Sequence, residues 1–171
     1  MTLGTLVREV KTEDREQIFA LLEAAFGQKD EGDIVEWLWR EEAVTLERVA
    51  EHGGVVVGYI AYSAVQTDPP IDGLQLGLAP LAVAPAHQQQ GFGTALVKET
   101  LSVCRDLGAG LIVVLGEPSY YGRFGFKPAS SRNMRWDALD AGDAFQLIAD
   151  DSVKGDTART IRYHPAFYAE S

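Results

Sequence analysis

The sequence predicts one domain of mixed α/β class, in which a mostly antiparallel central sheet carries helices on both faces. Three observations predict this fold. Segments with helical periodicity alternate with segments of strand periodicity, and the length of 171 residues suits one domain with its own core. The balance of 46% apolar to 23% charged residues is typical of a globular chain. We find no repeat or linker and assign residues 1–171 to a single domain.

The amino-terminal part is expected to form a strand followed by two helices. Thr12 can cap the first helix and Gly27 can end it. A second, shorter helix is predicted over residues 33–42, after a GQKDEGD stretch that reads as flexible, with Trp37 and Trp39 in the core. The apolar face of the first helix would consist of Ile18, Leu21, Leu22, Ala25 and Phe26.

The next segment changes to the period of strands. Residues 45–52 and 55–66 both alternate apolar and polar side chains in the manner of strands. The Gly53-Gly54 pair between them suits a two-residue hairpin turn. These two strands should therefore be antiparallel neighbours.

A distorted strand and a long helix follow. Residues 74–85 read as a buried strand, in which Gly77 and Pro80 imply a local irregularity. Residues 91–107 predict a helix that ends at Gly108. The apolar side of this helix would consist of Leu96, Val97, Leu101, Cys104 and Leu107.

The carboxy-terminal part returns to strands. Residues 111–116 form a short apolar run typical of a fully buried strand. A short helix is expected at residues 119–124, and further strands at residues 145–149 and 158–164. This order of elements places helices on both faces of one sheet.

Composition and charge narrow the range of functions. The formal net charge is −10 and the 15 basic residues are scattered, so we expect no nucleic-acid or membrane partner. Cys104 is the only cysteine, which excludes a disulfide within the chain and favours the reducing cytoplasm. One cysteine and three dispersed histidines show no zinc spacing, so we expect no metal. The acidic surplus could attract cationic amines or simply keep the protein soluble.

The segment from Val83 to Thr94 is the most informative part of the sequence. It leads a buried strand into a helix through Gly91 and Gly93. Unpaired amides and the positive end of the helix dipole could hold a pyrophosphate there, and the glycines would let it approach the backbone. The dinucleotide fingerprint fails because Leu96 stands where a third glycine is required, and a nucleoside-triphosphate loop fails because no Gly-Lys pair opens the helix.

Two motifs occur in order, separated by one helix and one strand. Residues 83–93, VAPAHQQQGFG, contain Val-x-Pro and then Gln-x-x-Gly-x-Gly. Residues 121–126, YGRFGF, fit Tyr-x-x-x-Gly-Phe. Together they resemble the acetyl-CoA loop and the tyrosine segment of the GNAT superfamily of N-acetyltransferases, of the bacterial predicted-acetyltransferase type. The resemblance covers about the first three-quarters of the chain.

This resemblance implies an enzyme that moves an acetyl group from acetyl-CoA to an amine. The strand with Leu81 and Val83 would splay from the one at residues 111–115, so that pantetheine enters the gap. Amides near Val83 would then hold the thioester carbonyl. The cofactor-binding residues would be Leu81, Ala82, Val83, Gln88, Gln89, Gln90, Gly91, Phe92, Gly93 and Thr94.

The resemblance also implies the catalytic acid. Tyr121 stands where family members commonly donate a proton to the leaving sulfur, although a tyrosine there could also serve only to pack the short helix. The base is predicted from position and not from the resemblance: Glu117 follows the carboxyl end of the buried strand, where it could face the cleft or form a turn before proline, and His87 is a weaker choice. Acceptor contacts are expected from the first two helices and the later strands, where the acidic side chains between residues 30 and 33 would either attract a cation or form a solvated loop.

Several alternatives stay open at this stage. The acceptor could be a small molecule, a peptide, a protein amino terminus or a lysine. A non-catalytic module that binds acyl-CoA, and a purely structural domain, are different readings that a test of acetyl-CoA binding and turnover would separate. Either a monomer or a homodimer fits the sequence.

Overall fold

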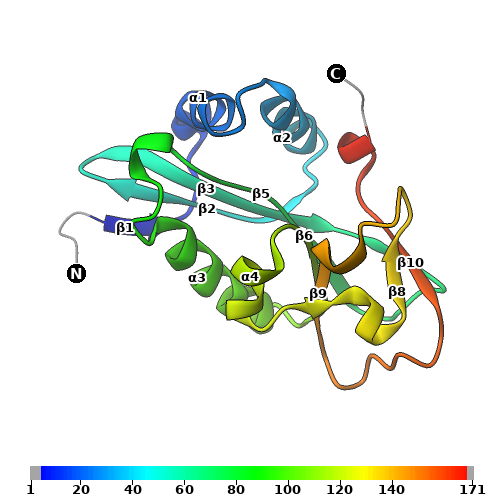
Figure 1. Ribbon diagram of the computed structural model, residues 1–171. Helices are drawn as coiled ribbons and strands as arrows, with labels where there is room; N and C mark the ends of the chain where they lie inside the picture. The colour runs from blue at the N-terminus through cyan, green and yellow to red at the C-terminus, as the bar shows by residue number, and fades with distance from the viewer. Residues whose placement is uncertain (1–4, 169–171) are drawn as a thin grey trace.

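The computed structural model describes residues 5–168 and contains two sheets (Figure 1). The larger sheet has seven strands, in the spatial order β1 (Thr5–Arg8), β2 (Val44–His52), β3 (Val55–Ala64), β5 (Leu74–Val83), β6 (Ala109–Leu115), β9 (Phe145–Ala149) and β7 (Lys127–Pro128). Its neighbouring strands are antiparallel except for the pair β5 and β6. The mixed, mostly antiparallel sheet is therefore confirmed.

The helices form a layer on each face of the large sheet. Helices α1 (Arg15–Phe26) and α2 (Asp30–Arg40) lie above it in Figure 1, and α3 (Phe92–Asp106) and α4 (Pro118–Tyr121) lie below it. A 3-10 turn, Gly122–Phe124, extends α4. None of the helices in the described range is both long and apolar enough to cross a bilayer.

The hairpin of β2 and β3 follows the sequence prediction. His52 and Val55 are paired across the turn, and the two residues between them, Gly53 and Gly54, have φ angles of 60° and 80°. Positive φ at both central positions is the requirement of the turn that best matches the twist of a two-residue hairpin. Glycine supplies that geometry without strain.

The start of α1 differs from the prediction, whereas its end agrees. A 3-10 turn, Thr12–Asp14, precedes the helix, and Thr12 does not act as its cap. The carboxylate of Asp14 instead accepts a hydrogen bond from the amide of Lys11 (2.7 Å). Gly27 ends the helix with φ of 74°, as expected. Phe26 is 42% exposed, in contrast to the buried residues Ile18, Leu21 and Leu22 of the predicted apolar face.

Helix α2 begins three residues earlier than predicted and ends at Arg40. Part of the stretch that reads as flexible is therefore helical. Its acidic residues lie in the first turn, where carboxylates interact favourably with the helix dipole. Trp37 and Trp39 are only half-buried. The indole of Trp39 donates a hydrogen bond to Glu47 (2.9 Å), and its ring packs against the edge of the core, whereas Trp37 packs edge-on to His164. The prediction that both lie in the core was therefore wrong for Trp37.

The central sheet opens where β5 and β6 separate. Their parallel register runs from Leu74 to Gly77 on β5 and ends at the pair Gly77 and Val113. Beyond this point β5 continues to Val83, paired only with β3. The β3–β5 register shifts beside Pro80, which confirms the predicted irregularity. We call the place where the two strands part the fork.

Helix α3 packs on the lower face of this sheet. It spans Phe92 to Asp106, and Gly108 follows it with φ of 82°. Cys104 is fully buried, and burial raises the pKa of its thiol to about 11, which fits a packing role. Leu107 is 50% exposed, in contrast to its predicted place on the apolar side.

The second sheet was not predicted as a separate unit. Its spatial order is β4 (Gln66–Asp68), β10 (Arg159–Arg162) and β8 (Met134–Trp136). The predicted strand at residues 55–66 divides accordingly between β3 and β4. The strands at residues 145–149 and 158–164 are confirmed as β9 and β10. After β10, the turn Pro165–Tyr168 brings the chain back beside α2 (Figure 1).

Candidate functional site

The loop between β5 and α3 presents open backbone amides. Gly91 adopts φ of 91° and Gln89 adopts φ of 62°, which turn the chain sharply into the helix. The first hydrogen bond of the helix runs from the amide of Ala95 to the carbonyl of Gly91 (3.0 Å). The three amides before Ala95 therefore have no acceptor within the helix. With the positive end of the dipole, they form a site for an anion.

A cleft of about 680 Å³ lies over this loop. It is lined by Leu81, Val83, His87, Gln88, Gln89, Gly91, Phe92, Gly93, Thr94, Ser119, Tyr120 and Arg123. All the predicted cofactor residues line it except Ala82 and Gln90. Ala82 is buried in the core under α1, because successive side chains of a strand point to opposite faces. Gln90 is exposed and donates from Nε2 to the carbonyl of Ala86 (3.4 Å).

The side chain of Gln88 holds the loop in place. Its Nε2 donates a hydrogen bond to the carbonyl of Val83 (3.1 Å), which ties the loop to the end of β5. This glutamine is therefore engaged with the backbone. The anion site itself consists of main-chain groups, which is why the residue types alone identify it poorly.

Sequence reasoning missed three residues of this cleft, Ser119, Tyr120 and Arg123. A Cβ on Gly93 would lie 2.8 Å from the hydroxyl of Tyr120, so the glycine allows this ring to lie over the start of α3. The guanidinium of Arg123 lies 4.5 Å from the centre of the Tyr120 ring, and its Nε donates to the Tyr120 carbonyl (3.2 Å). The available signal was the position of Arg123 inside the YGRFGF motif.

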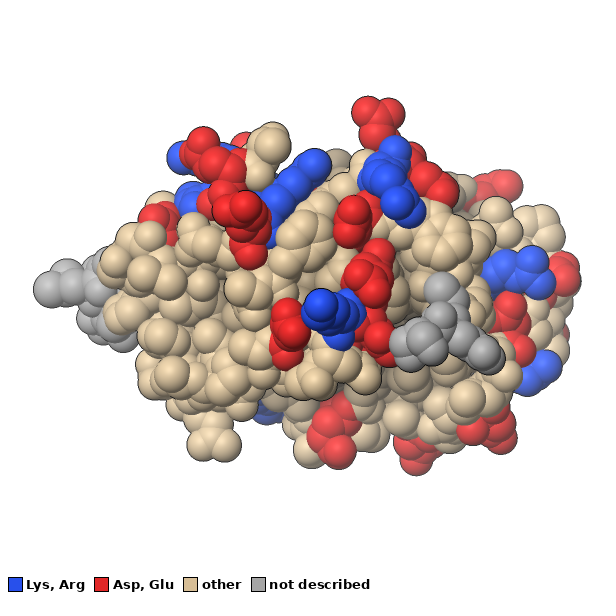
Figure 2. Space-filling model, turned by 90° about the horizontal axis from the view of Figure 1, so that it is seen from above, with Lys and Arg blue, Asp and Glu red and all other residues tan. Residues whose placement is uncertain are grey.

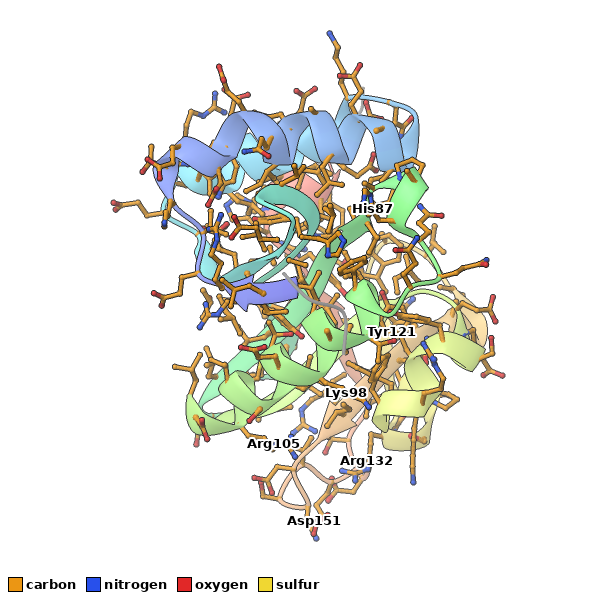
Figure 3. All side chains as sticks on the ribbon, turned by 90° about the vertical axis from the view of Figure 1, so that its left-hand side faces the viewer. His87, Lys98, Arg105, Tyr121, Arg132 and Asp151 are labelled. Carbon is orange, nitrogen blue, oxygen red and sulfur yellow. The ribbon has the colours of Figure 1, made fainter. Side chains whose placement is uncertain are left out.

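His87 closes the other side of the cleft. Its ring packs edge-on to Phe92 (6.0 Å between centres) and to His52 (6.0 Å). Its Nδ1 is buried and has no hydrogen-bond partner among residues 5–168. In Figure 3, His87 and Tyr121 lie on the same side of the molecule, with His87 nearer α1 and α2. The two side chains belong to different walls of the site.

A second, smaller pocket of about 250 Å³ lies at the fork. It is lined by Phe26, Glu31, Ile34, Leu78, Ala79, Pro80, Leu81, Leu115, Tyr121 and Phe167. These residues come from the junction of α1 and α2, from the separated parts of β5 and β6, from α4 and from the carboxy-terminal turn. The pocket thus includes residues of the first two helices, from which the sequence predicted acceptor contacts, but none of the later strands β8, β9 and β10.

Tyr121 forms one wall of this second pocket. Its ring packs edge-on to Tyr120 (5.0 Å between centres) and to Phe126 (5.7 Å), and a Cβ on Gly116 would lie 2.5 Å from it. Burial, with a smaller effect of Tyr120, raises the pKa of the Tyr121 hydroxyl to about 12. The phenol therefore keeps its proton at neutral pH and can act as a donor.

Glu117 lies outside both cavities. It is exposed at the start of α4, where its Oε1 accepts a hydrogen bond from Ser119 (3.3 Å). It is absent from the described residues that line the cleft and the pocket. In the described part of the chain, His, Cys, Asp and Glu side chains do not gather into a group of three that could hold a metal ion.

The two cavities share one residue, Leu81 on β5. An anion site of main-chain amides on one side of a forked sheet, and a small pocket on the other, is the arrangement of an acyltransferase whose donor carries a nucleotide. The chain belongs to the acetyltransferase (GNAT) family, whose model matches residues 13–126.

Related proteins support this assignment over nearly the whole chain. The uncharacterized N-acetyltransferase YhbS of Escherichia coli (strain K12) is 35% identical over 158 residues, which cover 90% of this chain and 93% of YhbS. The crystal structure of Escherichia coli YhbS in complex with CoA has a TM-score of 0.91 at 33% identity, covering 100% of this chain and 96% of that one. A GNAT family acetyltransferase from Brucella melitensis, in complex with acetyl-CoA, has a TM-score of 0.80 at 34% identity, covering 95% and 97%.

Proposed function

We propose that this protein transfers the acetyl group of acetyl-CoA directly to a primary amine, in a complex that holds both substrates at once. The observation that carries the proposal is that Leu81 lines both cavities. A donor in the larger cleft and an acceptor in the smaller pocket would meet at the fork, so no acetylated enzyme is needed. The YhbS structure is a complex with CoA and the Brucella structure a complex with acetyl-CoA, which supports acetyl-CoA as the donor.

The diphosphate of the cofactor would bind at the start of α3. The amides of Phe92, Gly93 and Thr94 supply hydrogen bonds to it, and Arg123 supplies a positive charge in the same cleft. The pantetheine arm then runs along the separated part of β5 towards Leu81. Main-chain groups of β5 that have lost β6 as a partner are free to bind this arm as an added strand would.

The transfer itself needs two proton movements. The neutral amine attacks the thioester carbonyl carbon, the carbon–sulfur bond breaks, the nitrogen loses a proton and the sulfur gains one. We assign the donation to sulfur to Tyr121, whose raised pKa keeps its hydroxyl protonated. We propose Glu117 as the base. Because its exposed carboxylate lies outside the acceptor pocket, it would accept the proton through a water molecule.

Two measurements test the proposal together. Calorimetry should show acetyl-CoA binding, and a panel of amines and peptides should release free CoA thiol with at least one acceptor. Binding without thiol release for any acceptor would support a non-catalytic acyl-CoA module instead. Absence of binding at millimolar acetyl-CoA would refute the donor site.

We further propose that the reaction takes place in the reducing cytoplasm, because the single cysteine is buried and forms no disulfide within the chain.

A further inference from the structure

The acceptor pocket at the fork is apolar except for the hydroxyl of Tyr121 and the carboxylate of Glu31. Eight of its lining residues are aliphatic, aromatic or proline: Phe26, Ile34, Leu78, Ala79, Pro80, Leu81, Leu115 and Phe167. Tyr121 adds a hydroxyl, and Glu31 is the one charged side chain among the described residues of its lining. Phe26 and Leu115 are 42% and 45% exposed, so the pocket presents apolar surface that an acceptor could cover.

The two cavities have opposite charge. Among the described residues that line the donor cleft, Arg123 is the one side chain with a permanent charge, and it is positive. The acceptor pocket has only the negative charge of Glu31. An anionic diphosphate fits the first cavity and a cation fits the second. The chemistry of the two sites is thus complementary to a nucleotide donor and an ammonium acceptor.

The surface around the acceptor pocket is also negatively charged. Residues 13–42, which include α1 and α2, contain ten acidic and three basic residues. Figure 2 shows acidic side chains gathered over the face that these two helices form. A cation would be drawn towards this face, and an anionic acceptor would be repelled. The sequence left open whether the acidic residues between positions 30 and 33 attract a cation or form a solvated loop. One of them, Glu31, lines the acceptor pocket, and the others lie on the same acidic face.

The size of the pocket limits what it can take. The pocket has a volume of about 250 Å³. Sites for drug-sized ligands have volumes of about 300–1,000 Å³, so this pocket is slightly smaller. A short aliphatic or aromatic body fits the apolar walls. A sugar or polyol would set most of its hydroxyls against apolar side chains, where each one that loses its hydrogen bonds to water costs binding free energy.

We propose that the acceptor is a small primary amine on a short apolar body, and that Glu31 binds its ammonium group before transfer. This inference rests on the proposed acetyltransferase function and adds the class of acceptor. Glu31 is the specificity-determining residue, since it decides that the bound group is a cation. Its carboxylate is restrained by Gln28, whose Nε2 donates to Glu31 Oε1 (3.3 Å).

The first experiment compares acceptors on the wild-type protein. With acetyl-CoA present, 2-phenylethylamine should be acetylated with a kcat/KM at least about tenfold above that of ethanolamine, because only the former covers the apolar walls. Equal rates for the two amines would overturn the apolar part of the proposal. A higher rate for a peptide with amino-terminal phenylalanine than for 2-phenylethylamine would overturn the small-molecule part.

The second experiment tests Glu31 itself. Glu31→Gln should raise the KM for 2-phenylethylamine about tenfold or more and leave the KM for acetyl-CoA within about twofold, as expected for loss of a charged hydrogen bond. The matched control is Asp33→Asn, an exposed acid on the same helix that does not line the pocket. Equal effects of the two substitutions would refute the role of Glu31.

A binding measurement separates this inference from the proposed function. N,N-dimethyl-2-phenylethylamine keeps the cation but cannot form a stable amide. In the presence of CoA it should bind the wild-type protein by calorimetry, and about tenfold more weakly the Glu31→Gln variant. If acetyl-CoA binds and some amine is acetylated while this ligand binds both proteins equally, only the acceptor inference fails. If acetyl-CoA does not bind, the proposed function fails first.

Discussion

Replacement of Tyr121 by Phe removes the proposed acid and keeps the ring. The ring is held by carbon contacts with Tyr120, Phe126 and Gly116, and the hydroxyl has no hydrogen bond to another residue in the range 5–168. The variant should therefore unfold with a free energy within about 1 kcal/mol of the wild type. A positioned general acid contributes about 100-fold or more to the rate. We expect kcat to fall by this factor, which corresponds to about 2.7 kcal/mol.

The assay is release of free CoA thiol at saturating amine and acetyl-CoA, between about pH 6 and pH 9. Since burial raises the pKa of Tyr121 to about 12, its proton stays bound throughout this range. The profiles of wild type and variant should therefore be parallel, with no limb that belongs to Tyr121. Tyr120→Phe is the matched control, because Tyr120 lines the donor cleft and should change the KM for acetyl-CoA rather than kcat. A Tyr121→Phe turnover within about twofold of wild type at every pH would refute the acid role.

Three further predictions concern the donor site, pH and the core. Gly93→Ala should weaken acetyl-CoA binding about tenfold in calorimetry, because its Cβ would meet the Tyr120 hydroxyl at 2.8 Å, and unchanged binding would contradict this. Arg8 holds Asp14 by two hydrogen bonds of 2.8 and 2.9 Å and lowers the pKa of its carboxyl. A carboxyl whose pKa is lower in the folded state stabilises the fold at every pH above its pKa in the unfolded state. This contribution should therefore be lost as pH falls below about 4. Asp14→Asn should lower the free energy of unfolding by about 2 kcal/mol at pH 7, measured by urea unfolding. Tyr163→Phe should leave the melting temperature unchanged or higher, since the buried hydroxyl has no partner in the described range; a drop of about 5 °C would contradict this expectation.

The parts of the fold that depend on local signals could be predicted from the sequence. The Gly53-Gly54 turn and the helix end at Gly27 each need a conformation that glycine adopts without strain. The start of α2 was placed too late, because GQKDEGD is polar and contains two glycines. The acidic residues of this stretch are also suited to the first turn of a helix. Only the tertiary structure decides between a polar loop and a helix start.

The second sheet shows what local reasoning cannot supply. Strand β10 pairs with β4 and with β8, so that Ile161 faces Thr67 on one side and Trp136 on the other. Strands of three residues have too short a pattern to be recognised, and their partners lie far away in the chain. The same limit applies to Glu31, which acquires a role only because the fork brings α2, β5 and Tyr121 to one pocket.

Leu81 stands between the donor cleft and the acceptor pocket, and this has a thermodynamic consequence. In the proposed complex of both substrates, a shift of the Leu81 side chain on the arrival of one ligand would change the site of the other, so the two affinities would be linked. By reciprocity, the factor by which CoA changes the affinity for the amine must equal the factor by which the amine changes the affinity for CoA. A larger or smaller side chain at position 81 should alter that common factor, which makes one leucine the place to adjust communication between the substrates.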